Sequence, residues 1–164
     1  MGFSNDVLTA LSQEFSFPSS GALAVTVARL LLAAVLGGVI GLDREKKERS
    51  AGLKTHILVA VGSALFVLAP LYGGVTPGEN TRVIQGVVSG IGFLGAGAIL
   101  KLQKDGRVEG LTTAAGIWLT SAIGVAVGLG HGMVALVATV VALFVVSVLP
   151  HLMRPKPHAD EPLA

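Results

Sequence analysis

Five long apolar stretches follow one another along the chain, and each is about as long as a helix that crosses a lipid bilayer. Such a helix needs about 20 mostly apolar residues, because it rises about 1.5 Å per residue through about 30 Å of hydrocarbon. The stretches cover residues 22–42, 55–72, 83–100, 111–129 and 133–149. The pattern therefore predicts an all-α, polytopic membrane protein whose five transmembrane helices form one bundle.

The segments before and after these stretches are more polar. In residues 1–21, Leu8, Leu11 and Phe15 follow helical spacing, which predicts a short helix lying at the membrane interface. Residues 150–164 contain four prolines and several charges, so we expect this C-terminal segment to be a disordered tail.

Lysines and arginines are distributed unevenly over the loops. Ten of the 12 lie in residues 44–54, 101–107 and 154–156, which belong to alternate loops and the tail. Arg82 alone lies in the other set of loops, and Arg29 lies inside the first apolar stretch. Because loops rich in Lys and Arg stay in the cytoplasm, we expect the N-terminus outside and the C-terminus in the cytoplasm.

The first two apolar stretches resemble the third and fourth. A shift of 58 residues superimposes Gly37 on Gly95, Gly52 on Gly110, Thr55 on Thr113 and Ser63 on Ser121. The two helical hairpins would then form a parallel repeat about an axis along the membrane normal. Chance matches are common in a chain rich in Gly, Ala, Leu and Val, so duplication and coincidence both stay open.

Composition supports a lipid environment and excludes several classes of function. Hydrophobic residues make up 52% of the chain and charged residues 13%, against about 25% charged in an ordinary soluble domain. The chain has no cysteine, which excludes disulfides, thiolate metal sites and cysteine nucleophiles. Its basic residues flank apolar segments rather than aromatic ones, so nucleic acid is not an expected partner.

The sequence lacks the local motifs of enzymes and metal sites. It contains no nucleophile elbow, phosphate-binding loop, HExxH or paired carboxylates, and no two histidines have metal-ligand spacing. We therefore expect no enzymatic activity, no cofactor and no bound metal.

Polar residues gather near the predicted cytoplasmic ends of the helices. They are Asp43, Arg44, Arg49, Lys54, Thr55, His56, Thr112 and Thr113. Solvated ion pairs and helix caps would explain them without a function. The alternative is a buried polar cluster in which Asp43 pairs with Arg49 or Lys54, and the Gly-Leu-x-Thr turns bind an anion or a polar group of a partner.

Arg29, Gln85 and Ser89 lie within the apolar stretches and are the candidates for a polar path through the membrane. A charge such as Arg29 is expensive in hydrocarbon, so we expect it to be an interfacial anchor or to bind carbonyl groups or Gln85. Gln85 and Ser89 lie one turn apart and could line a polar path. All carboxylates lie outside the stretches, and Mg²⁺ prefers carboxylate ligands, so an ion site in mid-membrane is not favoured.

The third stretch is rich in glycine. Gly86, Gly90, Gly92, Gly95 and Gly97 lie along it, and Gly86 and Gly90 have the four-residue spacing that lets helices approach closely in lipid. Trp118 is predicted to pack against these small residues. Such helices could also associate as a homo-oligomer.

Several long blocks of the chain resemble the MgtC/SapB family of bacterial inner-membrane proteins. They are LLLAAVLGGVIGLDREKKERSAGLKTHILVAVGSALF, QGVVSGIGFLGAGAIL and VEGLTTAAGIWLTSAIGVAVGLG, which occur in this order within residues 22–149. The chain is similar to the short form of the family, which lacks a C-terminal cytosolic domain.

The resemblance implies five membrane helices and a role in adaptation to low magnesium or intracellular stress, including virulence in pathogens. For the best-known members it implies regulation of other membrane proteins, notably the proton-translocating ATP synthase. The leading hypothesis is therefore a non-enzymatic modulator, and the alternative is a transporter or channel for Mg²⁺ or another small solute. The residues that carry the resemblance, without assigned roles, are Asp43, Arg44, Gly52, Thr55, Gln85, Ser89, Gly90, Thr112 and Thr113.

Overall fold

The computed structural model describes residues 2–14, 19–76, 78–100 and 110–152, and every regular element among them is helical. The elements are α1 (Gly2–Glu14), α2 (Ser20–Lys46), α3 (Leu53–Tyr72), α4 (Asn80–Leu100), α5 (Leu111–Gly128), α6 (Gly132–Leu143), the π-helix η1 (Phe144–Val148) and α7 (Leu149–Leu152). The last three are continuous, so they form one bent helix. The predicted all-α class is confirmed.

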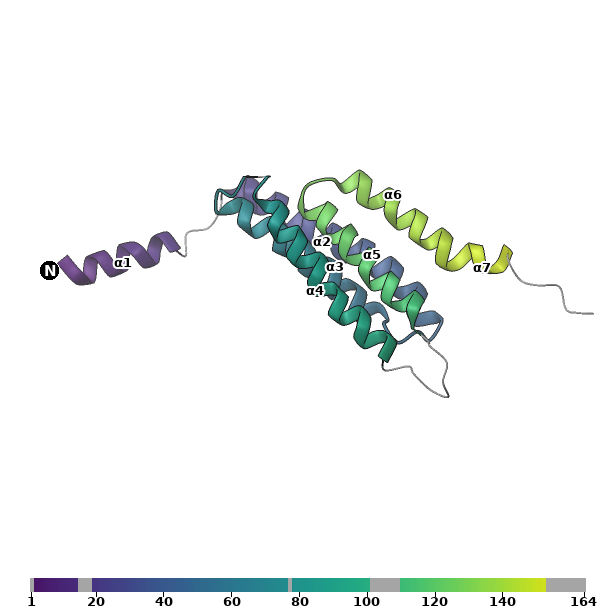
Figure 1. The fold of residues 1–164 in the computed structure, drawn as a ribbon. Helices are drawn as coiled ribbons and strands as arrows, with labels where there is room; N and C mark the ends of the chain where they lie inside the picture. The colour runs from purple at the N-terminus through teal and green to yellow at the C-terminus, as the bar shows by residue number, and fades with distance from the viewer. Residues whose placement is uncertain (1, 15–18, 77, 101–109, 153–164) are drawn as a thin grey trace, which may run out of the picture.

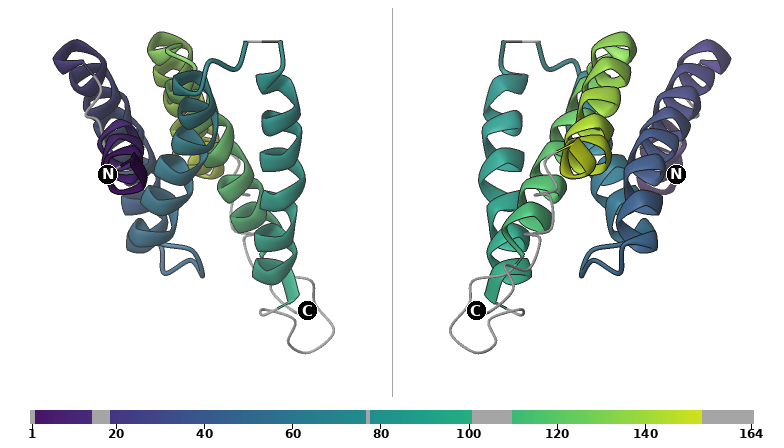
Figure 2. Two further views of the ribbon diagram at one scale, coloured as in Figure 1. Left: turned by 90° about the vertical axis from the view of Figure 1, so that its left-hand side faces the viewer. Right: turned by 90° about the vertical axis from the view of Figure 1, so that its right-hand side faces the viewer.

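Helices α2 to α6 form a bundle, with α2 at one edge and α4 at the other (Figure 2). Among the described residues, α2, α3, α4 and α5 are long and apolar enough to cross a membrane, and Gly132–Val148 is apolar but shorter. Helix α1 lies apart from the bundle (Figure 1). Its helical form agrees with the sequence, whereas its position at a membrane interface stays a prediction, and Phe15 lies outside the described residues.

The helix ends differ from the predicted boundaries in two places. Helix α2 continues through Lys46 rather than ending at residue 42, because apolarity marks only the part within lipid and charged residues can extend the same helix. The expected disordered tail from residue 150 is wrong at its start, since α7 includes residues up to Leu152. Residues 153–164 lie outside the described part.

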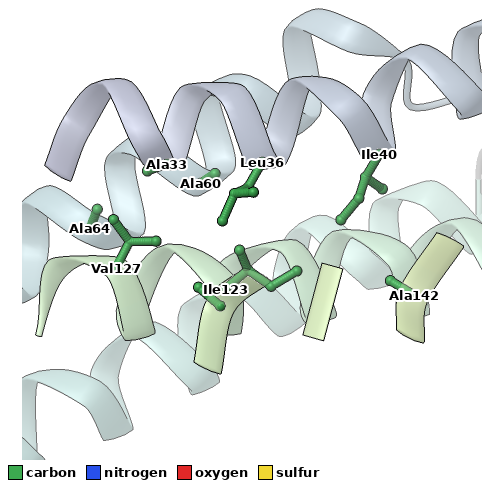
Figure 3. Close-up of a cluster of buried hydrophobic side chains, with 9 residues drawn as sticks. Ala33, Leu36, Ile40, Ala60, Ala64, Ile123, Val127 and Ala142 are labelled. Atoms are coloured by element: carbon green, nitrogen blue, oxygen red, sulfur yellow. The ribbon is translucent and has the colours of Figure 1, made fainter. Parts of the chain in front are cut away.

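The core of the bundle consists mainly of small side chains. Ala33, Ala60, Ala64 and Ala135 are completely buried, and they pack with larger residues of α2 and α5 such as Leu36 and Ile123 (Figure 3). Small residues let helix backbones approach closely, which maximises van der Waals contact where lipid offers no hydrophobic driving force.

Two glycines of α5 bring its backbone against α3. A Cβ atom on Gly124 would lie 2.2 Å from the carbonyl oxygen of Ala60, and one on Gly128 would lie 2.5 Å from that of Ala64. Gly37 and Gly41 play the same role between α2 and α3. Only glycine fits these four positions without a backbone shift.

The glycines predicted to pack helix α4 make no close backbone contact with another helix among the described residues. A Cβ atom would meet nothing within 4 Å at Gly86, Gly90, Gly92 or Gly97, and only an ordinary contact with Ala114 at Gly95. Glycine spacing shows that another helix can pack closely against this one, but it does not identify that other helix. Trp118, which is half exposed, is also not enclosed as predicted.

Helix α4 begins with a capping box in the sequence Thr76-Pro77-Gly78-Glu79. A Glu79 carboxylate oxygen accepts hydrogen bonds from the Thr76 backbone N–H at 3.0 Å and hydroxyl at 2.8 Å, and the Thr76 hydroxyl accepts one from the Glu79 N–H. These bonds hold the pKa of the Glu79 carboxyl below its usual value. The buried Asn80 amide donates to the Val67 carbonyl, which fixes the start of α4 on α3.

Replacing Gly124 by alanine should destabilise the bundle strongly. The new methyl group would overlap the Ala60 backbone, and overpacking of this kind typically costs about 1–3 kcal/mol. We expect a clear drop in melting temperature in mild detergent. Gly62→Ala is the control, because a Cβ there meets nothing within 4 Å. Equal melting temperatures for the two variants would contradict the backbone contact.

Candidate functional site

A cluster of charged and polar groups joins the C-terminal end of α2 to η1. One Asp43 carboxylate oxygen accepts from the Lys47 ammonium at 2.8 Å and from the Ser147 hydroxyl at 2.6 Å. The other oxygen accepts from two nitrogens of the Arg44 guanidinium. Arg44 is 3% exposed, so this ion pair is largely withdrawn from solvent. We name Asp43, Arg44, Lys47 and Ser147 the α2–η1 cluster.

The Val146 carbonyl oxygen completes the cluster. It accepts from the Arg44 guanidinium at 3.1 Å and from the Lys47 ammonium at 3.0 Å. In a regular α-helix this carbonyl would bond to the N–H of residue 150, but that residue is Pro150, which has none. The chain instead forms a π-helix here, a feature that often marks functional sites. The proline thereby leaves an acceptor for the two cations of α2.

The structure brings together only part of the predicted polar cluster. Asp43 pairs with Arg44 and Lys47, whereas Arg49 and Lys54, its partners in the buried-cluster alternative, are exposed. The four-residue spacing of Asp43 and Lys47 on one helix face could have indicated this pair. Ser147 had no local signal, because it reaches Asp43 only through the packing of distant helices.

The start of α3 is held by a neighbouring carboxylate that the sequence analysis missed. Glu45 accepts a hydrogen bond from the Leu53 backbone N–H at 2.6 Å. A Cβ atom on Gly52 would lie 2.0 Å from the same carboxylate oxygen, so a larger residue there would displace the Glu45 carboxylate from this bond. The Glu45 side chain therefore caps α3, whose N-cap residue Gly52 offers no side chain of its own.

His56 is completely buried between α3 and α5. Its Nδ1 atom lies 2.9 Å from the Gly52 carbonyl oxygen, whereas its Nε2 atom has no hydrogen-bond partner among the described residues. Thr113 is buried, Thr55 is partly buried and Thr112 is exposed. His56 and the threonines belong to the packed helix ends and are not bonded to the α2–η1 cluster in any described contact.

A second set of polar groups lies deeper between α3 and α5. The hydroxyls of Ser63 and Ser121 are hydrogen-bonded at 2.7 Å, and both residues are buried. The neighbouring Thr120 hydroxyl is buried without a partner among the described residues. The described residues contain no group of three or more His, Cys, Asp or Glu side chains that could hold a metal ion.

Arg29 binds a helix end rather than Gln85. Its guanidinium donates to the Gly128 carbonyl oxygen at 2.9 Å. Gly128 is the last residue of α5, and the final carbonyls of a helix lack backbone partners and carry partial negative charge. Of the two alternatives left open by the sequence, Arg29 is a partner of carbonyl groups.

Helix α4 presents two different surfaces beside its contact with α5. Gln85, Ser89 and Gly92 are exposed and share one face by helical spacing, and neither polar side chain has a hydrogen bond to a described residue. On the opposite side, α3 and α4 enclose an open groove of about 660 Å³, lined by residues that include Gly62, Ser63, Phe66, Val83, Gly86 and Gly90. We name these the α4 polar face and the α3–α4 groove.

Removing the charge of Asp43 should weaken the fold. Asp43→Asn leaves the buried Arg44 without its anion, and breaking a buried ion pair in this way costs about 3–5 kcal/mol. Because Asp43 is partly exposed, we expect about 3 kcal/mol, measured by thermal or denaturant unfolding in detergent.

Glu48→Gln is the matched control for Asp43→Asn, since Glu48 is exposed in the following loop and surface changes usually alter stability by less than about 0.5 kcal/mol. If the Asp43→Asn and Glu48→Gln variants unfolded at the same temperature, Asp43 would have no structural role in the cluster.

Replacing Arg29 by methionine should loosen the end of α5. The change removes a charged hydrogen bond to Gly128 and a favourable interaction with the helix dipole, which together predict a loss of about 1–2 kcal/mol. Unfolding in detergent measures it. Arg49→Met, at an exposed position of the loop after α2, should have almost no effect, and a similar loss there would contradict a specific contact at Arg29.

The known proteins that resemble this chain match the part of it that forms these helices. The model of the MgtC family matches residues 30–154. "Protein SrpB" of Synechococcus elongatus is 44% identical over 140 residues, which cover 77% of this chain and 75% of that protein. No solved structure matches.

Two further relatives are longer than this chain. "Putative magnesium transporter YhiD" of Escherichia coli is 40% identical over 136 residues, 77% of this chain and 61% of that protein. "Protein MgtC" of Salmonella typhimurium is 44% identical over 117 residues, 71% of this chain and 49% of that protein. The chain thus spans about half to three fifths of their length. With its apolar helices, it is a multi-pass membrane protein that belongs to the MgtC family.

Proposed function

We propose that this protein is a non-enzymatic modulator of another protein of the bacterial inner membrane, acting in adaptation to low magnesium or intracellular stress. The observation that carries the proposal is the α4 polar face. Gln85 and Ser89 are exposed on a helix that is apolar enough to cross a membrane. In lipid, such side chains gain by hydrogen bonding to a neighbouring helix, so another membrane protein is the natural partner.

The α2–η1 cluster supports the same proposal, because it can hold the ends of α2 and η1 rigidly while a partner binds elsewhere. Its ion pairs join the last turn of α2 to η1, which holds those ends together without a metal or cofactor. The family resemblance makes the ATP synthase the first partner to test. The charge distribution supports a cytoplasmic position for the cluster, with the N-terminus outside.

The packing of α3 against α5 argues against a path through the bundle. Gly124 and Gly128 bring the two backbones into direct contact, and the groove on the other side of α3 has Ser63 as its one polar lining residue. The name of YhiD refers to magnesium transport, and the buried His56, Thr120, Ser63 and Ser121 are the groups that a transport path would use. Transport of Mg²⁺ or a small solute is therefore the second candidate.

We also propose that the two hairpins are an internal repeat. Ser63 and Ser121, which the shift of 58 residues superimposes, are bonded to each other, and equivalent residues close to a two-fold axis are expected to lie near each other in this way. Gly37 approaches His56, and the equivalent Gly95 approaches Ala114, which is the equivalent of His56. These contacts support a parallel pair of hairpins that meet along α3 and α5.

The proposal predicts that a membrane partner depends on the α4 polar face. Gln85→Leu and Gly92→Leu should abolish stoichiometric co-purification of one membrane protein and growth at low magnesium. Both positions are exposed, so the melting temperature should not fall. Gly90→Leu is the control, because it adds the same side chain on the other side of α4 and should keep the partner.

A flux measurement separates the two candidate functions. For a modulator, purified protein in vesicles should carry no Mg²⁺ above the background of empty vesicles. A saturable flux that Ser63→Ala or Thr113→Ala abolishes would establish transport instead. Partner recovery that is unchanged in Gln85→Leu would also contradict the modulator surface proposed here.

A further inference from the structure

The side of α4 that carries the α4 polar face extends beyond Gln85, Ser89 and Gly92 in both directions. Arg82 lies three residues before Gln85, and Ala96 lies four residues after Gly92. Spacings of three, four, three and four residues keep all five on one side of a helix, as in the seam between two helices that pack side by side. All five are exposed, and α4 forms an edge of the bundle (Figure 2). A further membrane helix can therefore lie along this seam.

Arg82 adds a positive charge to the seam. Within the described part of the chain, its guanidinium takes part in no ion pair and no side-chain hydrogen bond. Glu79, the nearest acidic residue in the sequence, accepts hydrogen bonds from Thr76 instead. A guanidinium binds a carboxylate especially well, because the two groups can form two parallel hydrogen bonds. We therefore expect an acidic group opposite Arg82 on the molecule that covers the seam.

Gln85 and Ser89 need hydrogen-bond partners deeper in the membrane than Arg82. With a rise of about 1.5 Å per residue, they lie about 5 and 10 Å farther along the helix. A lipid head group bound at Arg82 stays at the membrane surface, and acyl chains have no donors or acceptors for an amide or a hydroxyl. A second helix with polar side chains at the same depths can bond to both residues. The occupant is therefore a polypeptide rather than a lipid.

A second copy of this chain does not fit the seam. Two copies in the same membrane orientation would meet about a two-fold axis along the membrane normal, which places the two Arg82 side chains next to each other. Like charges repel each other most strongly where water is scarce. The seam itself contains no carboxylate that could neutralise them. The partner is therefore a different polypeptide.

We propose that the α4 polar face binds a transmembrane helix of another protein that carries a carboxylate opposite Arg82 and amide or hydroxyl side chains opposite Gln85 and Ser89. Opposite Gly92 and Ala96 the partner has small or apolar residues, since these positions offer only backbone and methyl contacts. The inference rests on the proposed function and deepens it, because it gives the chemistry by which the partner is recognised.

The test uses the full chain in phosphatidylcholine vesicles and synthetic membrane helices as probes. Each probe is a leucine and alanine helix of about 25 residues, made in both chain directions. It carries glutamate, asparagine, serine and glycine at spacings of three, four and three residues, and two further probes have glutamine or lysine in place of the glutamate. Energy transfer to a dye on the probe measures binding, with the second dye on a cysteine added at the C-terminus, since the chain has no cysteine.

We expect the wild-type protein to bind the glutamate probe about tenfold more tightly than the glutamine probe, the preference that one charged hydrogen bond supplies. Arg82→Gln should bind these two probes equally, and Arg82→Glu should prefer the lysine probe. Gln85→Leu should weaken the binding of every probe. Arg49→Gln is the matched control, because it removes an exposed arginine from the loop after α2, and it should keep the wild-type preference.

Four outcomes would overturn the inference. The first two are equal binding of the glutamate and glutamine probes by the wild type, and a preference for glutamate that persists in Arg82→Gln. The third is loss of the preference when phosphatidylglycerol is added, because a lipid head group would then occupy Arg82. The fourth is energy transfer between two labelled copies of the chain that Gln85→Leu abolishes, because a second copy would then cover the seam.

The proposed function can fail separately from this inference. A membrane protein whose co-purification is lost in Gln85→Leu but kept in Arg82→Gln would support the modulator and contradict the carboxylate. A partner that is lost in both variants supports both. If neither variant loses a membrane protein, the proposed function fails, while the probes still decide whether the seam recognises a carboxylate.

Discussion

The direct contact between the backbones of α3 and α5 is the constraint on which the rest of the bundle depends. Gly124 and Gly128 let α5 lie against the carbonyl groups of Ala60 and Ala64, at distances that no larger residue allows. Because lipid does not drive apolar helices together, such close contact and the hydrogen bonds within it supply the stability. The bond between Ser63 and Ser121 lies in this same interface, and α2 and α6 pack around it through other small side chains.

The position of the charged groups follows from that dry interior. The apolar stretches contain no carboxylate, so a cation inside them has backbone carbonyl oxygens as its acceptors, and cations beyond their ends can also reach Asp43. Arg29 binds the end of α5, and Arg44 and Lys47 bind the Val146 carbonyl that Pro150 leaves free. Helix α2 is thereby bonded to the end of α5 through Arg29 and to η1 through Arg44 and Lys47. These bonds satisfy backbone groups that would otherwise remain unpaired.

The sequence was sufficient to predict the helical class and the five apolar segments, because length and hydropathy depend on local composition. It could not predict which glycines pack. Gly86 and Gly90 have the expected spacing, yet the close contacts occur at Gly124 and Gly128, since spacing does not name the partner helix. Two features of the α2–η1 cluster had local signals: the helical spacing of Lys47 from Asp43, and the missing N–H of Pro150, which leaves the Val146 carbonyl free for it. Ser147 had none, because its bond to Asp43 joins residues 104 positions apart.

Helix α4 lies at one edge of the bundle and has two sides that are not packed against another helix among the described residues. This helix contacts α5 along one side, while Gln85 and Ser89 are exposed on a second side and the α3–α4 groove opens on a third. A change on either exposed side leaves the contact of α3 with α5 intact, so it alters binding without altering the fold. The close packing that stabilises the bundle therefore lies in the small residues of α2, α3 and α5, and the recognition surface that we propose lies on α4. A glycine-rich helix suits that role, because glycines without side chains let another molecule pack closely against the backbone on two sides.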